Sequence, residues 1–209
     1  MKAFIIIKSN KNRFFKGKIK IKECSYNNID YIVAEVSEVM LDSKKFLKFC
    51  DMFNENLIFQ KNRKIPKFAI PYSSYFYKLK FVFNEFENKV YGLNVGIEDK
   101  LGVLAGKIGN VLKCAVQVRI CTDNHSVYEQ YEDYYLEEYG TVPIVSEEKL
   151  KNCEAVLLTE KNPQILLNGQ LYEVLFKIDN SSPQISYLIE NGFDPFDIAS
   201  VFELNTIYV

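Results

Sequence analysis

The sequence predicts an α/β protein, with a mostly parallel sheet in its C-terminal half and a smaller α+β domain before it. The first observation is that strand-like and helix-like segments alternate from residue 91 onward. The second is the charge: residues 1–90 hold 18 Lys and Arg against 9 Asp and Glu, whereas residues 91–209 hold 8 against 18. We therefore expect a basic domain at 1–90 and an acidic domain at 91–209.

The composition indicates a globular protein and excludes several classes. The chain has 209 residues, of which 48% are hydrophobic and 25% charged. Its five cysteines are odd in number and never spaced C-x-x-C, which argues against a disulfide framework and a zinc site. No apolar run is long enough to span a membrane, and the first residues lack a cleavage site. We expect a cytoplasmic protein with no membrane partner.

The first half reads as a sheet covered by a helix. Three segments are rich in Ile and Val and are predicted to form antiparallel strands: 3–9, 17–23 and 29–41. Asp42 or Ser43 can then cap a helix that runs to about Gln60. Four residues fall on one face of that helix: Phe46, Cys50, Phe53 and Leu57. Residues 73–88 fit both a strand and a helix, and their length and initial serines favour a helix.

The second half alternates between strands and helices. The predicted strands are 91–98, 115–121, 142–146 and 154–160, and the predicted helical segments are 102–114, 126–140 and 147–153. Units of this length imply crossover connections, and so a parallel sheet with helices on both faces. A strand is also expected near 172–178.

Local signals mark the ends of several of these elements. Ser126 and Glu129 have the spacing of a capping box, and Gly140 is placed to end the same helix. Asn168-Gly169 predicts a tight turn. Asp194 and Pro195 together predict the start of a final helix.

Residues 93–160 resemble the NAD(P)-binding Rossmann superfamily, in the style of shikimate dehydrogenase and glutamyl-tRNA reductase cores. The resemblance lies in the order of the elements and in LKNCEAVLLTE, which is similar to the helix, turn and strand that lead to the fourth strand of such domains. It covers about a third of the chain. It implies a dinucleotide-binding loop after the first strand, where glycines let the backbone approach pyrophosphate.

The loop GIEDKLG, from Gly96 to Gly102, departs from that pattern. Glu98 and Asp99 stand where the family has small residues, and their charge and size oppose a pyrophosphate. We therefore predict that the protein binds no NAD(P) and has no cofactor. Receiver domains and haloacid-dehalogenase-like phosphatases also fit poorly, since each needs further acids that are missing here. Asp99 is instead expected to cap the following helix.

Two other residues complete a candidate pocket with Gly96, Glu98, Asp99 and Gly102. Asp123 lies 21 residues after Gly102, either as a ribose ligand or as a turn residue. His125, the only histidine, follows it on a loop, either exposed to solvent or acting with the three acids around Mg²⁺. The sequence contains no recognisable metal motif, and no catalytic base can be paired with a nucleophile.

The sequence favours a protein of interaction or regulation over an enzyme. Five acids and five tyrosines on the predicted helix at 126–140 suit either a docking surface for a basic partner or a solvated outer helix. The oppositely charged halves suggest self-association. A nucleotide- or nucleotide-sugar-dependent enzyme using Asp123 ranks second. Weak nucleic-acid binding ranks third, through a lysine stripe made of Lys8, Lys11, Arg13, Lys16, Lys18, Lys20 and Lys22.

Overall fold

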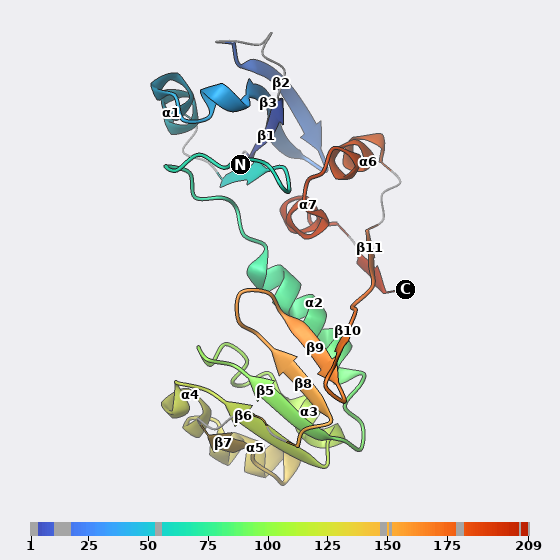
Figure 1. Ribbon diagram of the computed structural model, residues 1–209. Helices are drawn as coiled ribbons and strands as arrows, with labels where there is room; N and C mark the ends of the chain where they lie inside the picture. The colour runs from blue at the N-terminus through green and yellow to red at the C-terminus, as the bar shows by residue number, and fades with distance from the viewer. Residues whose placement is uncertain are drawn as a thin grey trace. The chain divides into compact units, whose positions relative to one another are not determined.

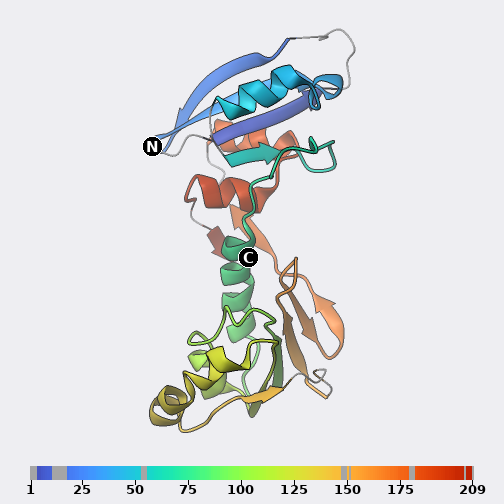
Figure 2. The ribbon, with the colours of Figure 1, turned by 90° about the vertical axis from the view of Figure 1, so that its left-hand side faces the viewer.

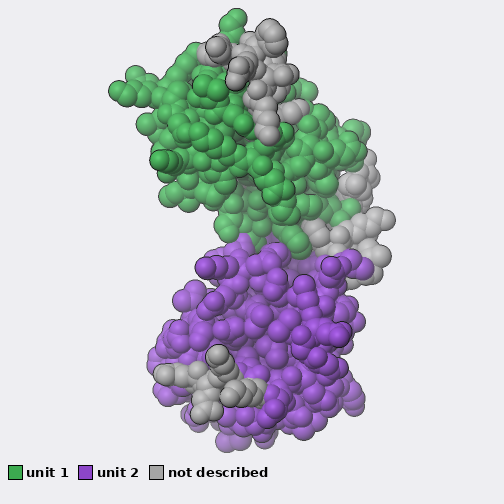
Figure 3. Space-filling model, viewed as in Figure 1, with its two compact units in different colours: residues 1–74, 176–209 green, residues 75–175 purple. Residues whose placement is uncertain are grey.

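The chain divides into two compact units, which differ from the predicted division at residue 90. The computed structural model describes residues 4–10, 18–52, 56–146, 150, 152–178, 182–204 and 206–208. One unit contains residues 1–74 and 176–209, and the other contains residues 75–175 (Figure 3). The final 34 residues thus belong with the N-terminal unit. Among the described residues, no helix is long and apolar enough to cross a membrane.

The first unit is built on a sheet of four strands in the order β2-β3-β1-β4 (Figure 1). The strands are β1 (Phe4–Asn10), β2 (Lys20–Tyr26), β3 (Ile29–Ser37) and β4 (Asn56–Phe59). Only β2 and β3 are antiparallel, whereas β1 is parallel to both β3 and β4. The expected antiparallel sheet is therefore wrong for β1. Strand β3 has buried residues on both faces, as expected for a sheet that is covered on both faces.

Helix α1 (Lys44–Asp51) follows a short 3₁₀ helix, η2 (Glu38–Met40). The predicted start is confirmed, because the Ser43 hydroxyl accepts a hydrogen bond from the Phe46 N–H at 3.1 Å. The predicted extension to Gln60 is wrong, since the helix ends at Asp51 and Leu57 lies on β4. Pairing with β1 buries three successive residues, Leu57 to Phe59, which a helical face cannot do. Phe53 lies outside the described residues.

Helices cover both faces of this sheet (Figures 1 and 2). Phe46 of α1 packs on one face, in a cluster with Ala34 and Val36. Helices α6 (Pro183–Glu190) and α7 (Pro195–Val201) cover the other face, where Tyr31 contacts the Phe202 ring edge to face at 5.0 Å. The predicted final helix is confirmed as α7.

The α7 start follows the predicted signal: the Asp194 carboxylate accepts a hydrogen bond from the Phe196 N–H at 2.8 Å. Helix α6 was missed by sequence reasoning, although Ser182 and Pro183 form the same kind of start. The strand expected near 172–178 is divided between two strands. They are β10 (Gln170–Tyr172) and β11 (Phe176–Ile178), and the latter pairs with β12 (Thr206–Tyr208).

The second unit contains a sheet of six strands in the order β10-β9-β8-β5-β6-β7. Four strands are parallel, as the sequence predicts: β5 (Asn94–Glu98), β6 (Gln117–Cys121), β7 (Ile144–Ser146) and β8 (Ala155–Leu158). Strand β9 (Gln164–Leu167) then runs antiparallel to β8 and forms a hairpin with β10. The turn predicted at Asn168-Gly169 is confirmed, with φ of 50° and 78°. The α/β class is therefore confirmed.

The helices of this unit are shorter than the sequence predicts, except for α2 (Tyr75–Glu87), which confirms the helix expected at 73–88. The segment 102–114 is helical only in α3 (Gly109–Cys114), because Gly102 and Gly106 have positive φ. The segment 126–140 forms two helices, α4 (His125–Glu129) and α5 (Glu132–Tyr139).

The predicted capping box is wrong, since Asn124 precedes the first residue of α4 and Ser126 lies inside the helix. Gly140, with φ of 69°, ends α5 as predicted. Most of the helical turn expected at 147–153 lies outside the described residues.

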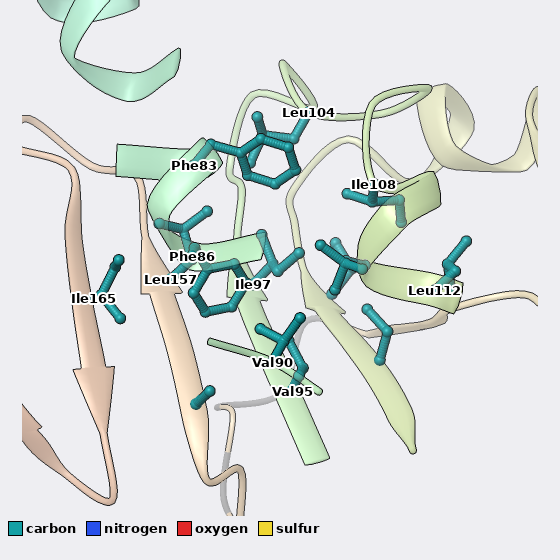
Figure 4. Close-up of a cluster of buried hydrophobic side chains, with 14 of the residues drawn as sticks. Phe83, Phe86, Val90, Val95, Ile97, Leu104, Ile108, Leu112, Leu157 and Ile165 are labelled. Carbon is teal, nitrogen blue, oxygen red and sulfur yellow. The ribbon is translucent and has the colours of Figure 1, made fainter. Parts of the chain in front are cut away.

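The described helices of this unit all pack on one face of the sheet, whereas the sequence predicts both faces. Apolar side chains from α2, α3, α4 and α5 form one cluster with those of β5, β6 and β8. Figure 4 shows Phe83 and Phe86 of α2 and Leu112 of α3 around Ile97 at the centre of the sheet. The described residues Leu150 and Cys153, which follow β7, lie over Gly96 on the opposite face of the sheet.

Candidate functional site

The candidate site lies where the strand order changes direction, at the carboxyl end of β5. From β5 the chain continues to β6 on one side, and β8 lies on the other, which is where open α/β sheets place their ligand crevice. The loops after the three strands meet here. The Asp99 N–H donates to Cys121 O at 2.9 Å, and the Thr159 hydroxyl donates to Glu98 O at 2.7 Å. The Tyr75 hydroxyl closes the β8 side by donating to Thr159 O at 2.6 Å.

The Asp99 carboxylate fills the centre of this loop. Its side chain is 0% exposed. One oxygen accepts a hydrogen bond from the Val103 N–H at 3.1 Å, and the other accepts from the Leu104 N–H and the Tyr128 hydroxyl, both at 2.8 Å. A buried carboxylate with three donors is strongly bound to its loop. The expected capping role is thus present, but it serves a loop of turns, since α3 begins only at Gly109.

Tyr128 is fixed as a donor by its surroundings. The side chain is buried, and burial, the negative charge of Asp99 and the hydrogen bond to Asp99 all raise the pKa of Tyr128 far above its ordinary value. The phenol is therefore protonated at neutral pH and donates to the Asp99 carboxylate.

The glycines later in the loop make room for tyrosines. We define the tyrosine layer as Tyr128, Tyr131, Tyr135 and Tyr139, which come from α4, α5 and the turn between them. Gly106 has φ of 79°, and a Cβ there would lie 2.7 Å from the Tyr131 ring. The Gly106 N–H donates to the Tyr135 hydroxyl at 2.7 Å. The loop's backbone thus faces phenol rings in the positions where a dinucleotide-binding loop would leave space.

Gly109 extends the same arrangement into α3. A Cβ at Gly109 would overlap the Tyr139 hydroxyl, so glycine lets the Tyr139 side chain pack directly against α3. Tyr139 in turn contacts the Tyr135 ring, with centroids 6.3 Å apart. Gly106 and Gly109 therefore both have a packing explanation.

The two glycines of the predicted pocket also have structural roles. Gly96 is buried on β5, and a Cβ there would lie 3.0 Å from Leu150 Cδ1 and 3.1 Å from Cys153 Sγ. Leu150 and Cys153 belong to the connection between β7 and β8 and lie directly over this position. Gly102 has φ of 72°, and a Cβ there would lie 3.3 Å from the Val127 side chain. Both glycines thus face this chain's own side chains.

The remaining predicted residues lie near the loop but do not converge on Asp99. Asp123 follows β6 with its side chain 70% exposed, and it forms an ion pair with Lys100 at 3.4 Å. The pKa of Lys100 is raised, chiefly by its interaction with Cys121 and further by its interaction with Asp123. His125 is half-buried at the first position of α4. Glu98 ends β5, and its backbone carbonyl accepts hydrogen bonds from the hydroxyl and the N–H of Thr159.

The described residues contain no group of three His, Cys, Asp or Glu side chains that could hold a metal ion. The alternative of a Mg²⁺ site among Glu98, Asp99, Asp123 and His125 therefore finds no geometric support, because the Asp99 oxygens already accept three hydrogen bonds.

The lysine stripe is only partly described. Lys18, Lys20 and Lys22 are exposed, and Lys20 and Lys22 lie on β2, an edge strand of the described sheet. The side chains of Lys8, Lys11, Arg13 and Lys16 lie outside the described residues. Lysines on an edge strand also discourage pairing with another chain.

Comparison with known proteins adds no relative: no protein-family model, curated protein or solved structure matches the chain.

Proposed function

We propose that residues 75–175 form a degenerate Rossmann-like domain that serves interaction or regulation instead of catalysis. The strand order supports the Rossmann-like part of the proposal. When the four parallel strands are numbered along the chain, β7-β6-β5-β8 has the order 3-2-1-4, which is that of one half of a dinucleotide-binding sheet plus its next strand. The antiparallel β9 and β10 then take the places of the next parallel strands.

One observation carries the loss of the ligand: the Asp99 carboxylate accepts hydrogen bonds from two backbone N–H groups in the loop after the first strand. In a working dinucleotide loop, backbone N–H groups at this place face a phosphate. Here an internal anion holds them, and the Tyr135 hydroxyl takes the Gly106 N–H. A pyrophosphate would have to displace a buried carboxylate and would meet its charge.

Interaction is the role that the exposed surface of this domain suits best. The outer sides of α4 and α5 carry exposed acids, namely Glu129, Glu132, Asp133, Glu137 and Glu138. Tyr134 and Leu136 are exposed among them and offer apolar contact area. We therefore propose a basic protein partner, or a second copy that presents its basic N-terminal half. Acids repel polyanions, so nucleic acid is disfavoured here.

Nucleotides provide the test, since the proposal predicts that none of them binds. Thermal unfolding of the full chain is measured with NAD, NADP, ATP and S-adenosylmethionine at millimolar concentration. A ligand at about 100 times its dissociation constant stabilises a protein by roughly 2.7 kcal/mol, which is readily detected. We expect no saturable shift. A shift with any of the four that disappears in Asp123→Ala, but persists in the matched control Asp133→Ala, would instead assign a nucleotide-dependent activity.

A further inference from the structure

The first unit contains a cavity of about 570 Å³ that sequence reasoning missed. It lies between the β2-β3 hairpin and α6, inside the unit formed by residues 1–74 and 176–209. Its volume falls in the range of small-molecule sites, which is roughly 300–1,000 Å³. No local signal predicts it, because its two walls are separated by more than a hundred residues along the chain.

The floor of the cavity is apolar. It is formed by Tyr31 and Val33 of β3 and by Leu188 of α6, all of which are buried. Pro183 and Tyr187 extend the apolar lining on the α6 side. Such a floor favours a ligand with a hydrocarbon or aromatic body, since burying apolar surface stabilises by about 25 cal/mol per Å².

The rim of the cavity carries more positive than negative charge. Lys20, Lys22 and Glu35 line it, and the strand register places Lys20 directly opposite Glu35. Lys22 lies opposite Val33, one of the residues of the apolar floor, and also lines the cavity. No described carboxylate forms an ion pair with Lys22. The rim thus has an acid opposite one lysine and a second lysine next to the floor.

The third cross-strand pair adds neutral polar groups. Cys24 lies opposite Tyr31, and both line the cavity. Burial, and secondarily the neighbouring Cys24, raise the pKa of Tyr31 to about 12. The phenol is therefore neutral at physiological pH and adds no negative charge against an anion.

We propose that this cavity binds a monoanionic amphiphile, that is, an apolar chain or ring bearing one carboxylate. The apolar body lies on Tyr31, Val33 and Leu188, and the carboxylate pairs with Lys22. One carboxylate matches the rim, where Glu35 opposes a second negative charge. A nucleotide or an oligonucleotide carries more charge than a rim with one acid and two lysines favours. This site is independent of the domain at 75–175, so the proposed function and this proposal fail or succeed separately.

A tryptophan reporter tests the proposal directly, because the chain contains no tryptophan. In Tyr187→Trp the single indole lines the cavity, and fluorescence is titrated with octanoate, octanol and octylamine. We expect saturable binding whose affinity decreases from octanoate to octanol to octylamine. Combining Lys22→Glu with Tyr187→Trp should lower the affinity for octanoate about tenfold or more. This is the loss expected when a hydrogen bond between charged groups is removed. The matched control Lys18→Glu, an exposed lysine outside the cavity lining, should leave binding unchanged.

A second readout does not depend on the reporter. Cys24 lines the cavity, so octanoate should slow its alkylation by a maleimide in the wild-type chain and should leave the rate at Cys114 unchanged. Three results would overturn the proposal: no octanoate binding at millimolar concentration, equal affinity for octanoate and octylamine, or equal weakening by the changes at Lys18 and Lys22. Circular dichroism of each variant confirms that it is folded.

Discussion

Asp99→Ala is expected to lower the free energy of unfolding of the domain at 75–175 by about 3 kcal/mol, because it leaves buried donors without an acceptor. The Val103 N–H, the Leu104 N–H and the Tyr128 hydroxyl all donate to the carboxylate. Water has little access to them, since Asp99, Leu104 and Tyr128 are buried. Urea denaturation of the full chain measures the loss, and hydrogen exchange at the β5 amides assigns it to this domain.

Glu98→Ala is the matched control for that prediction. Glu98 is the other acid of the same loop, and its backbone carbonyl, which the substitution preserves, accepts the hydrogen bonds from Thr159. We expect a change within about 0.5 kcal/mol. Equal losses for the two variants would mean that the Asp99 carboxylate does not organise the loop.

Tyr135→Ala should destabilise the same domain by about 3–5 kcal/mol, the usual range for truncating a buried aromatic side chain. Tyr135 is fully buried in the cluster that α2, α3 and the sheet share. Tyr135→Phe keeps the ring and removes only the acceptor for the Gly106 N–H, so its expected cost is about 1–2 kcal/mol. The difference between the two variants separates packing from hydrogen bonding.

The comparison needs a tyrosine that does not face the loop. Tyr134 is 45% exposed and its hydroxyl contacts that of Tyr139, so Tyr134→Phe should change stability by less than about 0.5 kcal/mol. If Tyr135→Phe behaves like Tyr134→Phe in urea denaturation, Tyr135 contributes only apolar contact. The hydrogen bond to Gly106 would then have no role in holding the loop.

Local signals predicted the parts of the fold that depend on few neighbouring residues. The helix start at Ser43, the turn at Asn168-Gly169 and the helix start at Asp194 are all confirmed. Each depends on contacts within about four residues along the chain. The parallel sheet also followed from the sequence, since alternating strands and helices require crossovers.

Errors arose where partners distant in the sequence decide the structure. Leu57 has the apolar spacing that continues the face of α1, yet pairing with β1 makes it part of a strand. Strands β2 and β3 form an antiparallel hairpin, and it is β3 that pairs with β1. The pairing of β1 is therefore parallel. Helices were expected on both faces of the second sheet, but the sequence does not show on which face a helix packs, and the described helices all pack on one.

The sequence pointed to the loop after β5 as the candidate site. It predicted the capping role of Asp99 but not the role of the glycines. The acid at Asp99 led to the prediction that no dinucleotide binds, which stays a prediction, and its capping role could be foreseen from its place after a strand. The role of the glycines could not, because Gly106 meets Tyr135 across 29 residues of sequence. The spacing of tyrosines on 126–140 resembled an outer helix, and nothing local distinguishes a ring that covers a loop from one that covers a sheet.

Chemical rescue of Asp99→Gly tests most directly whether the loop is an anion site held by its own carboxylate. The substitution removes a group equivalent to acetate and frees the Val103 and Leu104 N–H groups. Thermal unfolding is measured against sodium acetate, with sodium chloride at equal ionic strength as the control. We predict a saturable stabilisation of Asp99→Gly, of about 1 kcal/mol at five times the dissociation constant, with no such effect in the wild type or in Glu98→Gly. Equal responses of all three proteins to acetate would contradict the account.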